Sequence, residues 1–465
     1  MSTKKQPSFA AAAVVCFGTL LILAGGILIF GIGVHVLLIL ALMLTGAVSY
    51  SYGYSSAEMI DGMKSSLSRA TPAMIIFILI GTIIGSWIHA GTVPALIYYG
   101  LEFINAQYFL PMGLIICSMT SLATGTSWGT IGTVGIALMG IGMGLGISPP
   151  LIAGMIISGA YFGDKLSPIS DTTNLSAASA DANLYDHIVA MLYTTVPAYV
   201  ICLIIYTALG YGFTAEANIN LAQVTQIQSI LDEKFNLNLI VLLPMLALLV
   251  MMLIKINAIP AMLLTTFLAT LISLIFQNSS LTEALTAIND GYTQESGIKM
   301  VDDILLRGGV QSMMWTFSMV YLALCLGGVL EKAGYLTVLV EKIVTRIRSA
   351  ANLVTLVIST TFLSNVATSS NYMSIILNGS IYRKVFEEAG LKRRMLSRLL
   401  EEGGTQTAAL IPWNAAAAFA AGTLGVSTLS YLPYTFLNYL NPLLSILLAY
   451  LGIFIFRVAP KKSHQ

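Results

Sequence analysis

The sequence predicts an all-α polytopic membrane protein, and its composition and hydropathy pattern are the main reasons. Of its 465 residues, 57% are hydrophobic and 9% are charged, and the mean hydropathy is +0.84. A soluble domain carries roughly 25% charged residues. The apolar runs are continuous over about 20 residues, the length that a helix needs to cross a bilayer. They lack the alternation of apolar and polar residues that is typical of membrane β-barrels. These features exclude soluble enzymes and disordered proteins.

The charge and the cysteines exclude several kinds of partner. A net charge of +1 provides no field that would attract nucleic acid. The four cysteines are widely spaced within apolar runs, so we interpret them as small core residues rather than disulfides or metal ligands. We expect no cofactor. The first apolar run follows Lys4 and Lys5 and is too long for a signal-peptide core, so we expect an uncleaved first helix.

The apolar segments form two groups on either side of a polar stretch, 214–236, which we expect to be an extracytoplasmic linker. The first group, within residues 1–213, comprises 9–30, 33–51, 71–92, 107–145, 149–192 and 194–213. The second group, within residues 237–465, comprises 237–255, 258–276, 312–331, 352–381, 399–421 and 432–456. The chain therefore divides into two halves with the same number of segments.

Short matches between the halves indicate an internal duplication. They recur at offsets of 240 to 244 residues and pair Ala90-Gly91 with Ala333-Gly334, Ala123-Thr124 with Ala367-Thr368, and Gly163 and Asn174 with Gly403 and Asn414. Each match alone is at chance level, but a nearly constant offset across three segments is not. Duplicated halves are the usual architecture of secondary transporters.

Two segments in each half are interrupted by Gly, Pro, Ser, Thr and Asn, which disfavour a continuous helix. The interruptions are 124–130 and 163–174 in the first half, and 364–371 and 401–414 in the second. Unwound backbone at membrane depth is tolerated only where protein buries it or where it lines a wet cavity. We therefore predict a binding site at the breaks. The alternative is that small residues only allow close helix packing.

The distribution of basic residues predicts the topology. If 107–145 and 352–381 are re-entrant hairpins, each half crosses the membrane five times, so the two repeats are inverted and the total is about ten transmembrane helices. The segments 149–192 and 399–421 are then broken helices. With both termini in the cytoplasm, only Lys234, Lys299 and Arg307 lie outside, Lys165 lies in the membrane, and every other Lys and Arg lies inside. The positive-inside rule favours this arrangement.

Charged residues in the first broken helix indicate function, because a charge at the bilayer centre costs about 2.5–3.5 kcal/mol on insertion scales. Asp164, Lys165 and Asp171 lie in this break. Glu401 and Glu402 begin the corresponding break, or alternatively lie at the cytoplasmic boundary as solvated residues.

Asp164 and Asp171 are the best candidates for ion binding. Hard oxygen ligands suit Na⁺, and we expect it at Asp171, Thr172 and Asn174, with Thr173 beside them. A buried carboxylate that holds either a proton or Na⁺ produces antiport by competition. Lys165 could be the counter-charge of the empty site; alternatively, an Asp–Lys pair only pins the broken helix.

The hairpin tips and the second break offer further oxygen ligands and half-helix ends, which attract ions. They supply Thr124, Ser127, Asn365, Thr368, Ser370, Asn371, Thr405, Thr407 and Asn414 as candidates for Na⁺, for a carboxylate substrate, or for both. No arginine lies in a tip or a break. Its absence weakens the case for a dianionic substrate without excluding one, because Lys165 and the helix ends could serve.

Three strings resemble the NhaC family of Na⁺/H⁺ antiporters, and the resemblance covers nearly the whole chain. They are Ala-Thr-Gly-Thr-Ser-Trp-Gly-Thr (123–130), Gly-Asp-Lys-Leu-Ser-Pro-Ile-Ser-Asp-Thr-Thr-Asn (163–174), which is the most specific, and Gly-Gly-Thr-Gln-Thr (403–407). The resemblance places the chain in the ion-transporter superfamily and implies inverted repeats with hairpins, an elevator mechanism and a homodimer. The family also contains members similar to malate/lactate exchangers.

We therefore expect a multi-pass antiporter of the bacterial inner membrane that expels Na⁺ in exchange for protons. A Na⁺- and H⁺-coupled exchanger of small carboxylates is the alternative. A channel would have no use for two broken repeats. An enzyme is disfavoured, because the sequence contains no HExxH, GxSxG or P-loop motif. An aspartyl protease using Asp164 and Asp171 would leave the repeat unexplained.

Overall fold

The structure is a computed structural model that describes residues 6–103, 105–216, 221–344 and 349–458. The described residues form helices joined by short loops, with one isolated antiparallel bridge between Leu391 and Arg457. Nine of these helices are long and apolar enough to cross a membrane, or up to eleven if each of two bent pairs forms one span. The prediction of an all-α polytopic membrane protein is confirmed. The inverted repeat and the elevator mechanism stay predictions.

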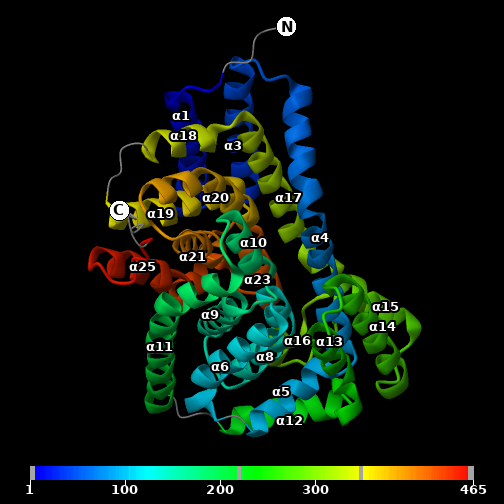
Figure 1. Cartoon of the computed structure of the whole chain (residues 1–465). Coiled ribbons are helices and arrows are strands. Elements are labelled where there is room, and N and C mark those ends of the chain that lie inside the picture. Colours follow the sequence, from blue (N-terminus) through cyan, green and yellow to red (C-terminus); the bar gives the residue numbers. More distant parts are fainter. Residues whose placement is uncertain (1–5, 104, 217–220, 345–348, 459–465) are drawn as a thin grey trace.

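The predicted apolar segments form helices, and shorter helices connect them (Figure 1). Those of the first half are α1 (Phe9–Leu20), α2 (Gly26–Leu28), α3 (Val34–Ser51), α4 (Ser56–His89), α5 (Thr92–Phe103), α6 (Ala106–Thr124), α7 (Ser127–Thr130), α8 (Ile136–Gly144), α9 (Pro149–Leu166), α10 (Asp171–Ser179) and α11 (Leu184–Glu216). Short π-helical turns, Leu21–Gly25 and Ile131–Gly135, join α1 to α2 and α7 to α8.

The predicted linker contains α12 (Leu221–Lys234), and the second half follows it. It continues with α13 (Leu243–Leu253), α14 (Ala258–Phe276), α15 (Leu281–Asp290), α16 (Lys299–Leu305), α17 (Gly309–Ala333), α18 (Tyr335–Val344), α19 (Ala350–Thr368), α20 (Asn371–Glu388), α21 (Arg393–Gly403), α22 (Thr405–Ala408), α23 (Ala415–Leu424), α24 (Thr428–Tyr431) and α25 (Phe436–Tyr450). Two short 3₁₀ turns, Leu239–Leu242 and Leu432–Tyr434, precede α13 and follow α24.

The long helices α4 and α17 run side by side through the molecule (Figure 1). Glycines allow their backbones to touch: a Cβ atom on Gly62 would lie 2.6 Å from the carbonyl oxygen of Gly328, and one on Gly328 would lie 2.4 Å from that of Gly62. Small residues allow this close approach of helices in a membrane. The pair thus forms a rigid wall, and the middle of α4 faces the broken helices.

The two segments predicted as hairpins each form a pair of antiparallel helices, and their re-entry into the membrane stays a prediction. In the first, Phe109 near the start of α6 lies against Gly142 near the end of α8, so the second leg returns to where the first began. In the second, the hydroxyl groups of Thr360 in α19 and Tyr382 in α20 are 3.0 Å apart.

The two hairpin tips share one backbone conformation. Gly125 and Ser369 are left-handed, with φ of 69° and 58°, and each ends the first leg. Thr126 and Ser370 follow in extended conformation and cap the second leg, accepting from the backbone N–H groups of Gly129 and Met373. The tips are 244 residues apart, the offset found in the sequence.

Both broken helices are present, with bounds that differ from the prediction. The first break is Ser167–Ser170, but α10 already ends at Ser179, and residues 184–192 belong to α11. The second broken helix starts earlier than predicted, at Arg393, and breaks at Gly404 and again at 409–414. Its first helix, α21, is strongly amphipathic. The polar residues of this helix made its beginning resemble a loop in the sequence, so the predicted segment started too late.

Burial decides between the two alternatives for Glu401 and Glu402. Glu401 and Glu402 are fully buried rather than solvated at the boundary. Arg398 is also buried, at 1% exposure, although the topology placed it among the cytoplasmic basic residues. Of the other basic residues in that prediction, Lys4, Lys5, Arg346, Arg348, Lys461 and Lys462 lie outside the described residues.

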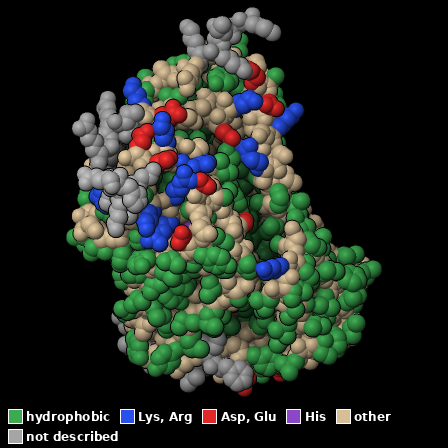
Figure 2. Space-filling model, viewed as in Figure 1, with side chains coloured by type: hydrophobic (Ala, Val, Ile, Leu, Met, Phe, Trp, Pro, Cys, Tyr) green, Lys and Arg blue, Asp and Glu red, His purple; other side chains and the backbone are tan. Residues whose placement is uncertain are grey.

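The surface has two zones (Figure 2). Lys, Arg, Asp and Glu side chains gather on the upper part of the face shown, whereas hydrophobic side chains cover most of the lower part. Several of these charges pair across elements, as in Lys332 with Asp61 at 2.6 Å and Arg69 with Glu331. The large hydrophobic surface is what a chain that spans a bilayer requires.

Candidate ion-binding cavity

A polar cavity of about 700 Å³, including its open mouth, lies where the two hairpin tips meet both breaks. It contains Asp164 and Asp171, together with the predicted candidates Ser127, Thr172, Asn371 and Thr405. The remaining lining residues are Pro72, Ala73, Ile76, Thr126, Trp128, Tyr161 and Tyr372. The residues come from both halves of the chain, and no Lys or Arg is found among these described lining residues.

Glycines in α9 bring Asp164 to the hairpin tip. A Cβ atom on Gly163 would lie 2.3 Å from the carbonyl oxygen of Ser118, so α6 and α9 approach backbone to backbone. The Asp164 side chain, 3% exposed, accepts a hydrogen bond from the Ser127 hydroxyl at 2.6 Å. Its other oxygen, Oδ1, is buried and has no partner among the described residues. A buried carboxylate oxygen without a donor is costly unless a cation or a proton satisfies it.

Asp171 is the first residue of α10 and is exposed at the cavity. Its Oδ1 accepts a hydrogen bond from the backbone N–H of Thr172 at 2.8 Å, and its Oδ2 accepts one from the Tyr372 hydroxyl. A negative charge at a helix N-terminus is favoured by the helix dipole. The two donors hold the Asp171 side chain in place at the cavity.

Glu401 is a site residue that the sequence analysis left undecided. It is fully buried in α21 and accepts hydrogen bonds from the hydroxyl groups of Thr172, at 3.2 Å, and Ser176. Thr172 therefore joins the cavity to a third carboxylate. The signal in the sequence was its position two residues before Gly403, which matches Gly163 at an offset of 240 residues. Only tertiary packing shows that the Glu401 side chain faces α10.

Lys165 is not the counter-charge of either aspartate. It is fully buried, and its Nζ donates to Oδ1 of Asn441 in α25 at 3.1 Å. Consecutive helical residues point about 100° apart, so Asp164 and Lys165 face different neighbours. No ion pair within 4.0 Å between described residues includes Lys165, so the alternative of an Asp–Lys pair that pins the broken helix is not observed there.

A separate buried charge pair lies behind the site. Arg398 Nε is 3.8 Å from Oε1 of Glu402, which also accepts from the Thr194 hydroxyl at 2.6 Å. The Arg398 guanidinium also lies over the Phe456 ring, 5.5 Å from its centroid. The cost of burying the pair is only partly offset, because Nε and Nη1 of Arg398 and Oε2 of Glu402 have no hydrogen-bond partner among the described residues.

The second break carries an amide cluster instead of carboxylates. Asn414 Nδ2 donates to Oδ1 of Asn365 at 2.7 Å, and Asn365 Nδ2 donates to the carbonyl oxygen of Gly404 at 2.8 Å. The Thr407 hydroxyl donates to the carbonyl oxygen of Gly403 at 2.6 Å. These candidates satisfy one another and the unwound backbone. They do not line the polar cavity.

The other predicted candidates mainly bond to backbone. The hydroxyl groups of Thr124, Thr173 and Thr368 donate to carbonyl oxygens, Asn174 Nδ2 donates to those of Pro168 and Ser170, and Ser370 caps α20. Asn174, a predicted Na⁺ ligand, is exposed and does not line the cavity. Its amide group stabilises the break, while Asp171 and Thr172 remain at the cavity.

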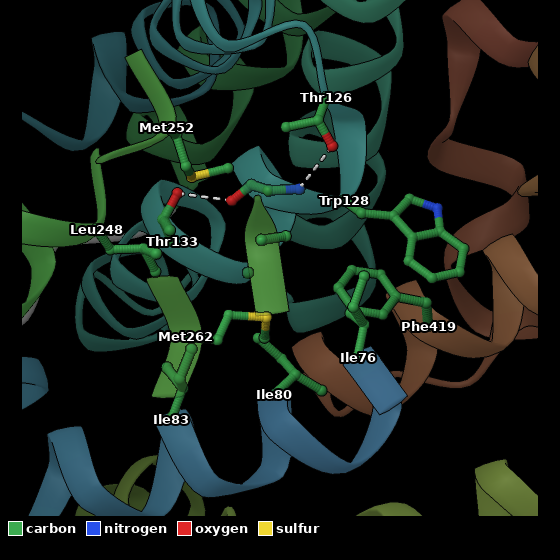
Figure 3. A pocket seen from close by; sticks show the side chains of 13 residues that line it. Ile76, Ile80, Ile83, Thr126, Trp128, Thr133, Leu248, Met252, Met262 and Phe419 are labelled. Atoms are coloured by element: carbon green, nitrogen blue, oxygen red, sulfur yellow. Dashed lines mark hydrogen bonds between the residues drawn. The ribbon is translucent and has the colours of Figure 1, made fainter. Parts of the chain in front are cut away.

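An apolar cavity of about 440 Å³ adjoins the polar one (Figure 3). Ile76, Thr126 and Trp128 line both cavities. The apolar side is formed by Ile80 and Ile83 of α4, by Leu248 and Met252 of α13, and by Ala258 and Met262 of α14, with Gly129, Gly132, Thr133 and Phe419. The Trp128 indole stacks on Phe419, with centroids 4.5 Å apart.

The polar cavity has the chemistry of a cation site. It combines two carboxylates with hydroxyl and amide oxygens, the ligands that hard cations prefer. Within the described residues, no group of three or more His, Cys, Asp and Glu side chains is arranged to hold a metal ion. The arrangement therefore differs from a dedicated metal cage of protein ligands.

Comparison with known proteins identifies the family. The Na⁺/H⁺ antiporter family matches residues 1–173 and 159–453. The chain is 37% identical to a malate-2H⁺/Na⁺-lactate antiporter of Bacillus subtilis, over 87% of this chain and 86% of that protein. It is 36% identical to an arginine/ornithine antiporter of Halobacterium salinarum, over 99% and 96%. It is 35% identical to the Na⁺/H⁺ antiporter NhaC of Alkalihalophilus pseudofirmus, over 90% of each chain. The chain belongs to the Na⁺/H⁺ antiporter family.

Proposed function

We propose that the chain exports Na⁺ in exchange for protons and that both ions use the polar cavity. The observation that carries this proposal is the pair Asp164 and Asp171 in a cavity that no described Lys or Arg side chain lines. A carboxylate that is neutralised by Na⁺ releases its proton, and one that is protonated loses its attraction for Na⁺. Such competition couples the two fluxes without a second site.

The side chains around the carboxylates have distinct roles in this proposal. Ser127 orients Asp164, because its hydroxyl occupies Oδ2 and leaves Oδ1 for the ion. Tyr372 and the N-terminus of α10 hold Asp171. Thr172 offers a hydroxyl oxygen whose proton is directed at Glu401; it accepts one hydrogen bond from the Ser170 hydroxyl, at 3.2 Å, and has one lone pair left for a cation.

The cellular setting follows from the same proposal. The chain is a multi-pass protein, and we place it in the inner membrane of a bacterial cell with both termini in the cytoplasm. The two halves are inverted repeats, and alternating access takes place by an elevator-like movement in a homodimer. The chain has no enzymatic role.

A second function, exchange of small carboxylates coupled to Na⁺ and H⁺, is favoured by the 37% identity to the malate/lactate antiporter. The composition of the cavity argues against it. Arg is the usual bidentate partner of a carboxylate, and Lys165 is bonded to Asn441 away from the cavity. The carboxylates of such a substrate would be repelled by Asp164 and Asp171, which line the cavity.

Proton flux in proteoliposomes with an acidic lumen distinguishes the two functions. Na⁺, then K⁺, then Na⁺ with malate or lactate is added outside, and lumenal pH is followed. We expect Na⁺ alone to collapse the pH gradient and K⁺ to leave it intact. A gradient that collapses only when an organic acid is present would overturn the antiporter proposal in favour of the exchanger.

A further inference from the structure

Arg307 lies in the short loop between α16 and α17, and two glycines fix the position of this loop. Gly308 and Gly309 are left-handed, with φ of 86° and 79°. A Cβ atom on Gly308 would collide with the backbone nitrogen of Gly85, so the loop packs backbone to backbone on α4. The carbonyl oxygen of Arg307 also accepts a hydrogen bond from the backbone N–H of Tyr292 at 3.2 Å. The backbone of Arg307 is therefore held in place from two sides.

The Arg307 side chain reaches the end of α23. Gly425 ends this helix with φ of 68°, and a Cβ atom there would collide with Nη2 of Arg307. The guanidinium therefore lies directly against the Gly425 backbone. Arginine side chains near the end of a membrane span usually extend towards water. Arg307 is instead partly buried between elements that belong to different parts of the chain.

The positive charge of Arg307 is not compensated by an acidic side chain. Among the described residues, its guanidinium has no ion pair within 4.0 Å and no hydrogen bond. The C-terminus of α23 contributes the equivalent of roughly half a negative charge. Withdrawing a charged group from water is costly unless a counter-charge and hydrogen bonds replace the water. The guanidinium can therefore still accept an anion as its partner.

A cavity of about 310 Å³, including its open mouth, lies beside this guanidinium. Arg307 and Thr423 are the two polar side chains among the described residues that line it. The rest of the wall is apolar and comes from α4, α5, α8 and α16, as with Ile84 and Met139. No carboxylate is found among these described lining residues, so the cavity has the opposite charge to the polar cavity around Asp164.

Thr423 provides a second hydrogen-bond donor. Its side chain is 3% exposed, and its Oγ1 is buried without a partner among the described residues. Buried threonines in other helices donate to the carbonyl group four residues earlier, as Thr45 and Thr360 do. The Thr423 hydroxyl makes no such bond, so its proton is available to an acceptor in the cavity.

We propose that this cavity binds a small inorganic anion of the halide class, such as Cl⁻, between the guanidinium of Arg307 and the hydroxyl group of Thr423. A halide accepts hydrogen bonds from both groups. It carries no further polar atoms that the apolar wall would leave unpaired, and the guanidinium itself is weakly hydrated. The bound anion would join the loop before α17 to the end of α23. The polar cavity shares no described lining residue with this one, so the anion site does not depend on the proposed Na⁺ function.

Equilibrium dialysis of ³⁶Cl⁻ against the purified full-length chain in detergent, in sodium gluconate buffer, tests this proposal. We expect saturable binding of one Cl⁻ per chain and its displacement by bromide at a similar concentration. Malate and lactate should require at least tenfold higher concentrations, because the cavity would leave their additional polar groups unpaired. Absence of saturable binding would overturn the proposal. Displacement by malate or lactate more readily than by bromide would also overturn it, because the site would then select carboxylates.

Three variants locate the anion. Arg307→Gln removes the charge and should lower the affinity for Cl⁻ at least tenfold. Thr423→Val removes only the hydroxyl group and should lower it about fivefold, which keeps the test available if Arg307→Gln does not fold. Lys299→Gln is the matched control, because Lys299 is an exposed basic residue at the start of α16 and does not line the cavity. Unchanged affinity in folded Arg307→Gln or in Thr423→Val would contradict the proposed site, as would an equal loss in Lys299→Gln.

Discussion

The two hairpin tips have the same backbone but different chemistry. Each tip places a left-handed residue, Gly125 or Ser369, before an extended capping residue. At the first tip, Ser127 donates to the carboxylate of Asp164 and leaves one oxygen without a partner. Near the second tip, Asn365 and Asn414 bond to each other. The backbone is therefore the same at both tips, and the side chains make them different: the first tip donates to a carboxylate, whereas the second contributes Asn371 and Tyr372 to the same polar cavity.

The second tip, which carries no charge, also holds a hydroxyl group without a partner. The hydroxyl group of Ser369 is buried and has no partner among the described residues. A single hydroxyl group competes poorly with two carboxylates for a cation, because neither a hydroxyl nor an amide carries charge. We therefore expect variants at the first tip to change ion affinity and variants near the second tip to change stability.

The largest effect is expected at Asp171. Asp171→Asn removes a charged ligand, which costs about 2–3 kcal/mol, or roughly 100-fold in affinity. Na⁺-driven proton flux should fall below detection in proteoliposomes that contain normal amounts of protein. Asp186→Asn is the matched control, because Asp186 pairs with Arg394 away from the cavity, at 3.9 Å. Wild-type proton flux in the Asp171→Asn variant would show that Asp171 is not part of the ion-binding site.

A smaller effect is expected from the hydroxyl group that orients Asp164. Ser127→Ala removes the 2.6 Å hydrogen bond to this carboxylate, and a hydrogen bond to a charged group is worth about 1.5–3 kcal/mol. The apparent KM for Na⁺ should rise about tenfold. Thr124→Ala, two residues before the capping residue, removes a hydroxyl group that bonds only to the carbonyl oxygen of Thr120. Equal effects of the two substitutions would argue against the assigned role of Ser127.

Asn414 should affect stability more than ion affinity. Asn414→Ala leaves Oδ1 of Asn365 buried without its donor and removes the cap of α23. The expected cost is about 1–3 kcal/mol of unfolding free energy, measured as a lower midpoint of thermal unfolding in detergent. The KM for Na⁺ in the folded protein should change less than threefold. A tenfold change in the KM for Na⁺ at unchanged stability would indicate that the ion binds near the second tip.

The smallest functional effect is expected at the end of the second hairpin. Glu388 is exposed, 3.8 Å from Lys384 in the same helix, and far from both breaks in the sequence. Glu388→Cys should transport normally and react with an impermeant thiol reagent only from the cytoplasmic side. Reaction from the outside would overturn the hairpin topology and, with it, the inverted relation of the two tips.

The sequence predicted the helical fold and the places where helices break. Continuous apolar runs determine the helical fold. The local preferences of Gly, Pro, Ser and Asn determine the helix breaks, as at Ser167–Ser170 and Gly404. These properties are local, so they can be recognised without knowledge of the neighbours. Element bounds were less accurate: α10 ends at Ser179, because the turn at Asp181, with φ of 51°, interrupts a sequence that remains apolar further on.

The partners of the charged groups depend on tertiary packing and could not be predicted in the same way. Tyr372 and Glu401 reach Asp171 and Thr172 only because the two halves dock against each other. The burial of Arg398 was missed because it follows Arg393 and Arg394, which pair with surface acids. Its i,i+4 relation to Glu402 was the available signal.

Equilibrium binding of ²²Na⁺ to purified protein in detergent decides whether the ion binds at the carboxylates beside the first tip. Two variants are compared: Asp164→Asn changes the carboxylate beside the first hairpin tip, and Asn414→Ala changes the amide cluster near the second. We predict that Asp164→Asn loses Na⁺ binding while remaining folded, and that Asn414→Ala, measured below its unfolding temperature, binds with nearly wild-type affinity. Retained binding in Asp164→Asn together with lost binding in folded Asn414→Ala would contradict the account.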